Sequence, residues 1–199
     1  MSFKDVIGHE TAVKILQNSL KARRSYGLSY LFYGPAGVGK SFVAKQFAKS
    51  LNCQNQDVDC CDSCDSCISS DKLEYPDLHW LDFQEDSENI KIEQVRLLQS
   101  EINLRPFGGR IKVFVINNCQ RLTEEAANCL LKVIEEPPID SVIILIAADL
   151  QRIIPTIASR CQKIRFTGLS RHRIEEILEK SQRFDIQTSH YLAYYLNGR

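Results

Sequence analysis

Residues 34–41 have the types and spacing of a phosphate-binding loop. The sequence Gly34-Pro35-Ala36-Gly37-Val38-Gly39-Lys40-Ser41 is a complete G-x-x-x-x-G-K-S/T motif. In such a loop the backbone N–H groups surround the phosphates, Lys40 reaches the β- and γ-phosphates, and the Ser41 hydroxyl binds Mg²⁺. The motif predicts a site for ATP or ADP. The alternatives are a chance glycine-rich turn and a relic loop that no longer binds.

The strand expected downstream lacks the acidic residues that hydrolysis requires. Residues 111–116 are followed by Asn117-Asn118, where a hydrolysing ATPase has Asp-Glu. An amide carries no negative charge, so it holds Mg²⁺ poorly and cannot act as a base toward water. Both residues also suit an ordinary turn. Glu124 and Glu125 follow in a predicted helix, and we do not expect them to substitute as bases.

Four cysteines form a candidate metal site with the spacing C-x7-C-x2-C-x2-C. They are Cys53, Cys61, Cys64 and Cys67. Thiolates two residues apart can meet one tetrahedral Zn²⁺, and four thiolates leave no open position, so we expect a structural metal. Residues 52–70 contain few apolar side chains to hold the segment folded, which favours zinc over a set of free thiols. Cys60 is a fifth candidate that could compete with Cys61.

Arg160 occurs in the sequence Ser159-Arg160-Cys161, just before the last predicted strand. An arginine at the edge of a sheet could reach the ATP of a neighbouring subunit, where a guanidinium stabilises the charge of phosphoryl transfer. From the spacing alone, a surface ion pair is the stronger interpretation.

The composition is that of a globular intracellular chain. The 199 residues are 44% hydrophobic, enough for one good core and the beginning of a second. Lys plus Arg and Asp plus Glu both number 25, which argues against a broad polyanion-binding surface. We find no membrane-spanning run and no signal peptide, so we expect a cytoplasmic protein. The eight cysteines are then metal ligands or free thiols.

Strands alternate with helices along the chain. We predict strands at residues 28–33, 78–83, 111–116, 142–147 and 163–166. We predict helices at about 12–20, 41–51, 93–104 and 124–136, and then in the segments 170–178 and 189–196. Thr123 is the expected N-cap of the fourth helix. The alternation predicts an α/β fold, a five-stranded parallel sheet flanked by helices, with the cysteine segment as an insertion.

These segments also carry a resemblance. The chain is similar to the delta-prime subunits of bacterial DNA polymerase III clamp loaders, members of the AAA+ group, and to their tau/gamma sister subunits. The most specific match is residues 126–138, Ala-Ala-Asn-Cys-Leu-Leu-Lys-Val-Ile-Glu-Glu-Pro-Pro. Other matches are residues 6–10, 30–34 with the phosphate loop, the four cysteines, 75–77, 90–96 and 159–161. Together they cover most of residues 3–166.

The resemblance implies a domain organisation and a set of partners. Residues 1–167 would form an AAA+ domain with a zinc module at 52–70, and residues 168–199 would begin a small helical lid. We do not expect the family's C-terminal collar within this sequence. The partners would be the tau/gamma and delta subunits, which use ATP to open a sliding clamp and load it on primer–template DNA. The chain would be a stator that donates Arg160 to a neighbour's ATP.

Two departures favour the stator over a motor. One is Asn117-Asn118, and the other is Ala147-Ala148-Asp149, which lacks the Thr or Asn that senses the γ-phosphate. The intact loop leaves nucleotide binding in place, with weakly held Mg²⁺. One alternative is an active ATPase motor of the tau/gamma kind. A second is a P-loop kinase, which would need a basic substrate lid that we do not find.

Overall fold

The computed structural model describes residues 1–22, 27–55, 58–83, 87, 89–108, 110–180, 188, 191 and 194. Five parallel strands form one sheet in the order β2-β3-β4-β1-β5. The strands are β1 (Leu28–Tyr33), β2 (Leu78–Leu81), β3 (Lys112–Ile116), β4 (Ser141–Ala147) and β5 (Gln162–Arg165). The predicted parallel sheet is confirmed.

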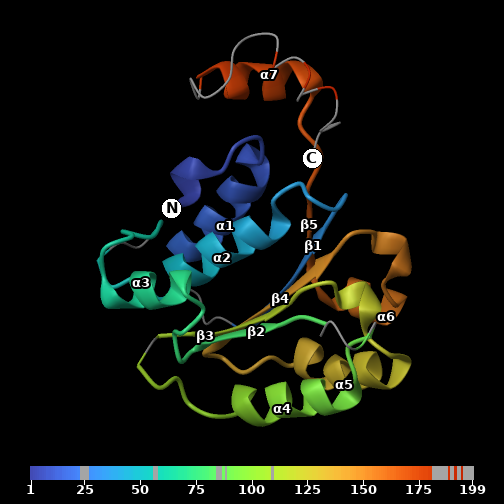
Figure 1. Ribbon diagram of the computed structural model, residues 1–199. Coiled ribbons are helices and arrows are strands. Elements are labelled where there is room, and N and C mark those ends of the chain that lie inside the picture. Colours follow the sequence, from blue (N-terminus) through green and yellow to red (C-terminus); the bar gives the residue numbers. More distant parts are fainter. Residues whose placement is uncertain are drawn as a thin grey trace.

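Helices cover both faces of this sheet (Figure 1). One face is covered by α1 (Glu10–Ala22) and α2 (Lys40–Leu51). The other is covered by α4 (Ile92–Ile102), α5 (Glu124–Glu135) and α6 (Pro155–Arg160). The short helix α3 (Asp65–Asp71) lies beside α2, and α7 (Arg171–Lys180) stands apart from the sheet. Three 3-10 turns complete the described elements: η1 (Phe3–Asp5), η2 (Cys119–Arg121) and η3 (Leu150–Arg152).

The strand sequences explain why the sheet is buried on both sides. Every residue of β4 is buried, and its side chains alternate between the two cores. Ile144 packs in the core under α1 and α2, whereas Ile143 packs in the core under α4 and α5. An unbroken apolar run is what a central parallel strand requires. The predicted N-cap is also confirmed, because the Thr123 hydroxyl accepts a hydrogen bond from the Ala126 backbone N–H at 3.2 Å.

The strand register brings the chemistry-bearing residues to one edge of the sheet. Tyr33 of β1 pairs with Ala147 of β4, and Ile116 of β3 pairs with Leu145. The carboxyl ends of parallel strands therefore meet at one edge, where α/β proteins place their ligands. The phosphate loop, Asn117-Asn118 and Ala148 all follow these strand ends.

The structure differs from the sequence prediction in several segments. The second strand ends at Leu81, two residues earlier than predicted, which leaves Asp82 at the edge of the sheet. The helices α3 and α6 were not predicted; α6 begins with Pro155, whose fixed φ suits the first helical turn. The helix predicted at 189–196 lies outside the described residues, of which only 191 and 194 fall in that range. No helix in the described part of the chain has the length and hydropathy needed to cross a bilayer.

Candidate functional site

The phosphate loop joins β1 to α2, as the motif predicts. Gly34 has φ of 147°, and a Cβ atom at this position would lie 2.0 Å from the carbonyl oxygen of Phe166. Gly39 has φ of 94° and precedes the first residue of α2. Only glycine tolerates both the backbone conformation at Gly34 and its close approach to the chain after β5. The sequence therefore fixes the path of the loop.

His9, in the N-terminal segment, contacts the phosphate loop. Its Nε2 atom lies 2.6 Å from the carbonyl oxygen of Val38, and its ring packs edge-on against Phe166 at 4.9 Å between centroids. His9 was not predicted to be a site residue. Its contact with the loop comes from the fold rather than from any local motif.

Lys40 lies over the loop with its charged end directed at backbone oxygens. Its Nζ atom donates to the carbonyl oxygens of Gly34 and Pro35, both at 2.6 Å. The side chain is buried, and burial lowers the pKa of Lys40. Phosphate oxygens are acceptors of the same kind with a full negative charge, so the ammonium is in place to bind them.

A pocket of about 370 Å³ opens beside the loop, within the usual size range of ligand sites. Its lining residues are Ala36, Gly37, Gly39, Lys40, Ser41, Phe42, Asn117, Asn118, Ile146 and Ala148. The pocket thus joins much of the predicted loop to the amide pair after β3. The side chain of Ala148 has no hydroxyl or amide with which to contact a phosphate. Glu124 and Glu125 are exposed on α5 and do not line the pocket.

Asp82 is a further site residue that was not predicted from the sequence. Its carboxylate accepts hydrogen bonds from the Nδ2 atoms of Asn117 at 2.7 Å and Asn118 at 3.1 Å. The other end of the Asn117 amide, Oδ1, accepts from the Ser41 hydroxyl at 3.2 Å. A chain of polar contacts therefore runs from the phosphate loop through Asn117 to Asp82. The signal that could have found it is a carboxylate directly after the second strand, at the edge shared by all the strand ends.

The four predicted cysteines come together in a cluster. The sulfur atoms of Cys53, Cys61, Cys64 and Cys67 all lie within 4.8 Å of one another. Four sulfurs around one Zn²⁺ with Zn–S bonds of about 2.3 Å would be about 3.8 Å apart, so the arrangement fits a tetrahedral ion. The Cys61 sulfur accepts hydrogen bonds from the Ser63 hydroxyl, the Asn55 amide and the backbone N–H of Cys64. The hydrogen bonds from Ser63, followed by those from Cys64, outweigh the effect of burial and lower the pKa of Cys61 to about 5, which favours the thiolate that a metal needs.

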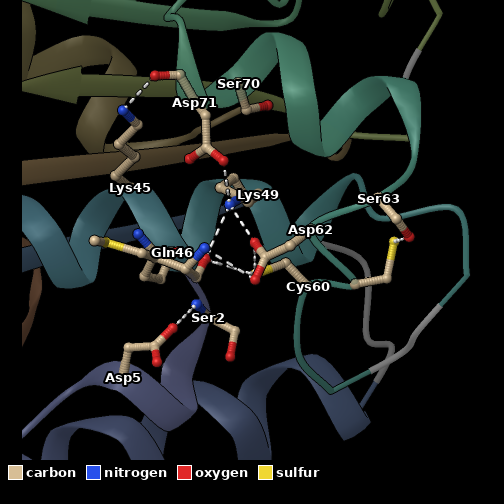
Figure 2. A network of polar contacts seen from close by, with 12 residues as sticks. Ser2, Asp5, Lys45, Gln46, Lys49, Cys60, Asp62, Ser63, Ser70 and Asp71 are labelled. Carbon is tan, nitrogen blue, oxygen red and sulfur yellow. Dashed lines mark hydrogen bonds and ion pairs between the residues drawn. The ribbon is translucent and has the colours of Figure 1, made fainter.

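Cys60 lies outside this cluster and has a different environment (Figure 2). Its thiol donates toward the backbone carbonyl of Met1 at 3.4 Å and lies 3.8 Å from Oε1 of Gln46. Burial raises the pKa of Cys60 to about 12, so the group stays protonated. The geometry thus separates the two neighbouring cysteines: Cys61 belongs to the candidate metal site and Cys60 does not.

A buried lysine ties the cysteine segment to the helix that follows the phosphate loop. Lys49 of α2 is 0% exposed, and its Nζ atom contacts Asp62 at 2.6 Å and Asp71 at 2.8 Å. It also donates to the carbonyl oxygen of Met1 at 2.9 Å. Figure 2 shows Asp62, in the loop between the cysteines, and Asp71, at the end of α3, converging on the ammonium. We call Lys49, Asp62 and Asp71 the lysine network.

Arg160 is the last residue of α6 and forms an ion pair in this chain. Its Nε atom lies 2.6 Å from Oε1 of Glu135, and both side chains remain more than one third exposed. Gln162 at the start of β5 pairs with Tyr30, four residues before Gly34. The start of β5 is therefore about 13 Å from the loop along the strand direction. Arg160 does not line the pocket of its own chain.

Comparison with known proteins places this geometry in a family. A family model described as "DNA polymerase III, delta subunit" matches residues 8–170. The chain belongs to this family of DNA polymerase III subunits. It is 38% identical over 167 residues to the delta' subunit of Bacillus subtilis (strain 168), covering 83% of this chain and 50% of that protein. It is 34% identical over 179 residues to the tau subunit of the same organism, covering 86% of this chain and 30% of that protein. The chain thus spans half or less of the length of these relatives.

Solved structures share the fold. A DNA polymerase III gamma subunit-related protein from Thermotoga maritima aligns with a TM-score of 0.54 at 22% identity, covering 92% of this chain and 57% of that one. The RuvB Holliday junction branch migration motor of the same organism aligns with a TM-score of 0.61 at 17% identity, covering 94% and 56%. These likenesses concern the fold alone, and they confirm the AAA+ architecture that the family resemblance implies.

Proposed function

We propose that this chain is a clamp-loader subunit of the stator kind, which holds ATP or ADP at residues 34–41 and hydrolyses little or none of it alone. The observation that carries the proposal is the contact between Ser41 and Asn117. An intact phosphate loop faces an amide at the position where a hydrolysing enzyme needs a carboxylate. Lys40 and Ser41 retain the chemistry of binding, but an amide does not accept a proton from water. The weakly held Mg²⁺ of the nucleotide would lie near Ser41.

Arg160 is proposed to act on the ATP of a neighbouring motor subunit. It lies too far from the loop of its own chain to act there, as the pairing of β5 with β1 requires. Its ion pair with Glu135 joins two partly exposed side chains, so breaking that pair costs no more than about 1 kcal/mol. The guanidinium is therefore available to a phosphate presented by a partner.

The partners follow from the family. We propose tau/gamma and delta subunits as direct neighbours, with the sliding clamp and primer–template DNA met through the assembled complex in the cytoplasm. Zn²⁺ is proposed as a structural ion on Cys53, Cys61, Cys64 and Cys67, because four sulfur ligands close its coordination. Such an ion would cross-link the segment that the lysine network attaches to α2.

An active motor of the tau/gamma kind is the second candidate. It is favoured by the 34% identity to the Bacillus subtilis tau subunit, which covers more of this chain than the delta' match does. Against it stand Asn117 and Asn118, which leave the pocket lining without a carboxylate. ATP turnover by the isolated chain with Mg²⁺ would decide in favour of the motor.

Two variants test the proposal. Lys40→Ala should abolish ATP binding measured by calorimetry, and equal affinity in both proteins would reject the loop as the site. Arg160→Ala in a reconstituted loader should depress ATPase about a thousandfold at the site that it serves. The control is Arg152→Ala, which removes the same charge from the exposed η3 turn and should leave turnover unchanged. Equal turnover of the Arg160→Ala and control complexes would reject the role in trans.

A further inference from the structure

Asp82 has a position that the proposed function does not yet use. It follows β2, at the sheet edge where the phosphate loop and the Asn117-Asn118 pair also lie. Both of its carboxylate oxygens accept hydrogen bonds from these amides. Asp82 Oδ2 accepts one from Asn117 Nδ2 at 2.7 Å, and Asp82 Oδ1 accepts one from Asn118 Nδ2 at 3.1 Å. The backbone N–H of Phe83 adds a third hydrogen bond, at 2.9 Å to Oδ1. The carboxylate is thus held in one place relative to the pocket.

The hydrogen bond to Asp82 decides which end of the Asn117 amide faces the nucleotide pocket. A carboxylate only accepts hydrogen bonds, so the NH₂ group of Asn117 must point at Asp82. The amide oxygen is left facing the Ser41 hydroxyl, and both residues line the pocket. Without the carboxylate, either end of the amide could turn toward the loop, and an NH₂ group cannot ligate a cation.

The two oxygens that result are spaced for a magnesium ion. Ser41 Oγ and Asn117 Oδ1 are 3.2 Å apart. Adjacent ligands of an octahedral Mg²⁺ with bonds of 2.0–2.1 Å are about 2.9 Å apart, so a small movement would let both bind one ion. An amide oxygen is a weaker ligand than a carboxylate, but the charge of Asp82 one hydrogen bond away makes that oxygen more negative.

We propose that Asp82 is a positioning residue: it orients the Asn117 amide so that its oxygen, together with the Ser41 hydroxyl, holds the Mg²⁺ of a bound nucleotide. The inference rests on the proposed nucleotide site. The sequence alone predicted only that the Asn pair holds Mg²⁺ poorly, and assigned no role to Asp82. The carboxylate follows β2, the neighbour of β3 in the sheet, and it acts through the amide of Asn117. This arrangement retains the ion while leaving no carboxylate in the pocket to activate water.

The test measures ATP affinity of the full chain in excess EDTA and in excess Mg²⁺, and takes the ratio of the two dissociation constants. Mg²⁺ should tighten binding by the wild type. Asp82→Asn should reduce that enhancement by about tenfold or more, the usual effect of losing a group that orients a metal ligand. Asp140→Asn makes the same chemical change in an exposed side chain just before β4, at the opposite edge of the sheet, and should behave as wild type.

A swapped pair keeps the test decisive if Asp82→Asn folds poorly. In Asp82→Asn combined with Asn117→Asp, the new amide donates to the new carboxylate, so the enhancement should return to the wild-type level or exceed it. An Asp82→Asn ratio equal to that of wild type would overturn the proposal, as would a swapped pair no better than Asp82→Asn. Wild-type binding without any Mg²⁺ effect rejects only the role of Asp82. No binding in either condition rejects the nucleotide site itself.

Discussion

Removing both acidic partners of Lys49 should destabilise the protein more than removing Lys49 itself. The ammonium is 0% exposed, whereas Asp62 and Asp71 are 36% and 42% exposed. Burial lowers the pKa of Lys49, but the hydrogen bonds to the two carboxylates outweigh it and raise the pKa above its ordinary value. The buried charge therefore depends on these partners, whereas the partners retain contact with water.

The expected magnitudes follow from this asymmetry. Removing the partner of a buried charge costs about 3–5 kcal/mol. We reduce this to about 2–3 kcal/mol for the double variant Asp62→Asn with Asp71→Asn, because solvent screens the two exposed carboxylates. Lys49→Met keeps a similar length and leaves two carboxylates that water can solvate, so it should cost about 1 kcal/mol. Adding Lys49→Met to the double variant should recover most of the loss.

Urea unfolding of the zinc-saturated protein measures these differences. Asp140→Asn, an exposed aspartate before β4, serves as the control and should be neutral within about 0.5 kcal/mol. The opposite outcome is that Lys49→Met is as destabilising as the double variant, or that the triple variant is the least stable of all. Either result would mean that packing of the lysine stem, rather than its buried charge, dominates the lysine network.

Further predictions concern the loop, the cysteines and acid stability. Gly34→Ala should destabilise the fold by at least about 2 kcal/mol in the same assay, whereas Gly108→Ala, with no neighbour within 4 Å of an added Cβ, should be neutral. Metal analysis should find about one zinc per chain, retained in Cys60→Ser and lost in Cys61→Ser; zinc-free reduced wild type would contradict this. Burial raises the pKa of Asp62, but hydrogen bonds from Lys49 and the N-terminal amine outweigh burial and hold this pKa below its ordinary value of 3.8. The stability that these hydrogen bonds contribute is present above pH 3.8 and is lost as the pH falls further. Asp62→Asn should therefore flatten this part of the acid unfolding curve.

The sequence predicts those parts of the fold that depend on local pattern. Apolar runs such as residues 142–147 mark the buried strands, and the Thr123 cap follows from its side chain alone. The helix α3 escaped prediction because six of its seven residues are Ser, Asp or Cys, and a single Ile68 makes no apolar stripe. Its place beside α2 depends on the cysteine cluster and on Asp71 reaching Lys49.

The candidate site is predictable where it is a contiguous motif and missed where it is assembled by the sheet. The phosphate loop and the cysteine spacing are visible in the sequence, and the structure brings each set together. Asp82 was missed because the second strand was predicted to run through residue 83, which placed this residue inside the sheet. Lys49 was missed because a lysine in a helix is ordinarily exposed, whereas here the ammonium is buried against the cysteine segment and the N-terminal segment.

A single-turnover experiment tests the separation of ATP binding from hydrolysis most directly. The pure chain, in excess over labelled ATP and with Mg²⁺ present, is followed for conversion of the bound nucleotide to ADP. We expect that ATP binds through Lys40 and stays intact, because Asn117 and Asn118 offer no base. Conversion at about 1 s⁻¹ or faster, the range of ordinary enzymes, that is also absent from Lys40→Ala, would contradict it.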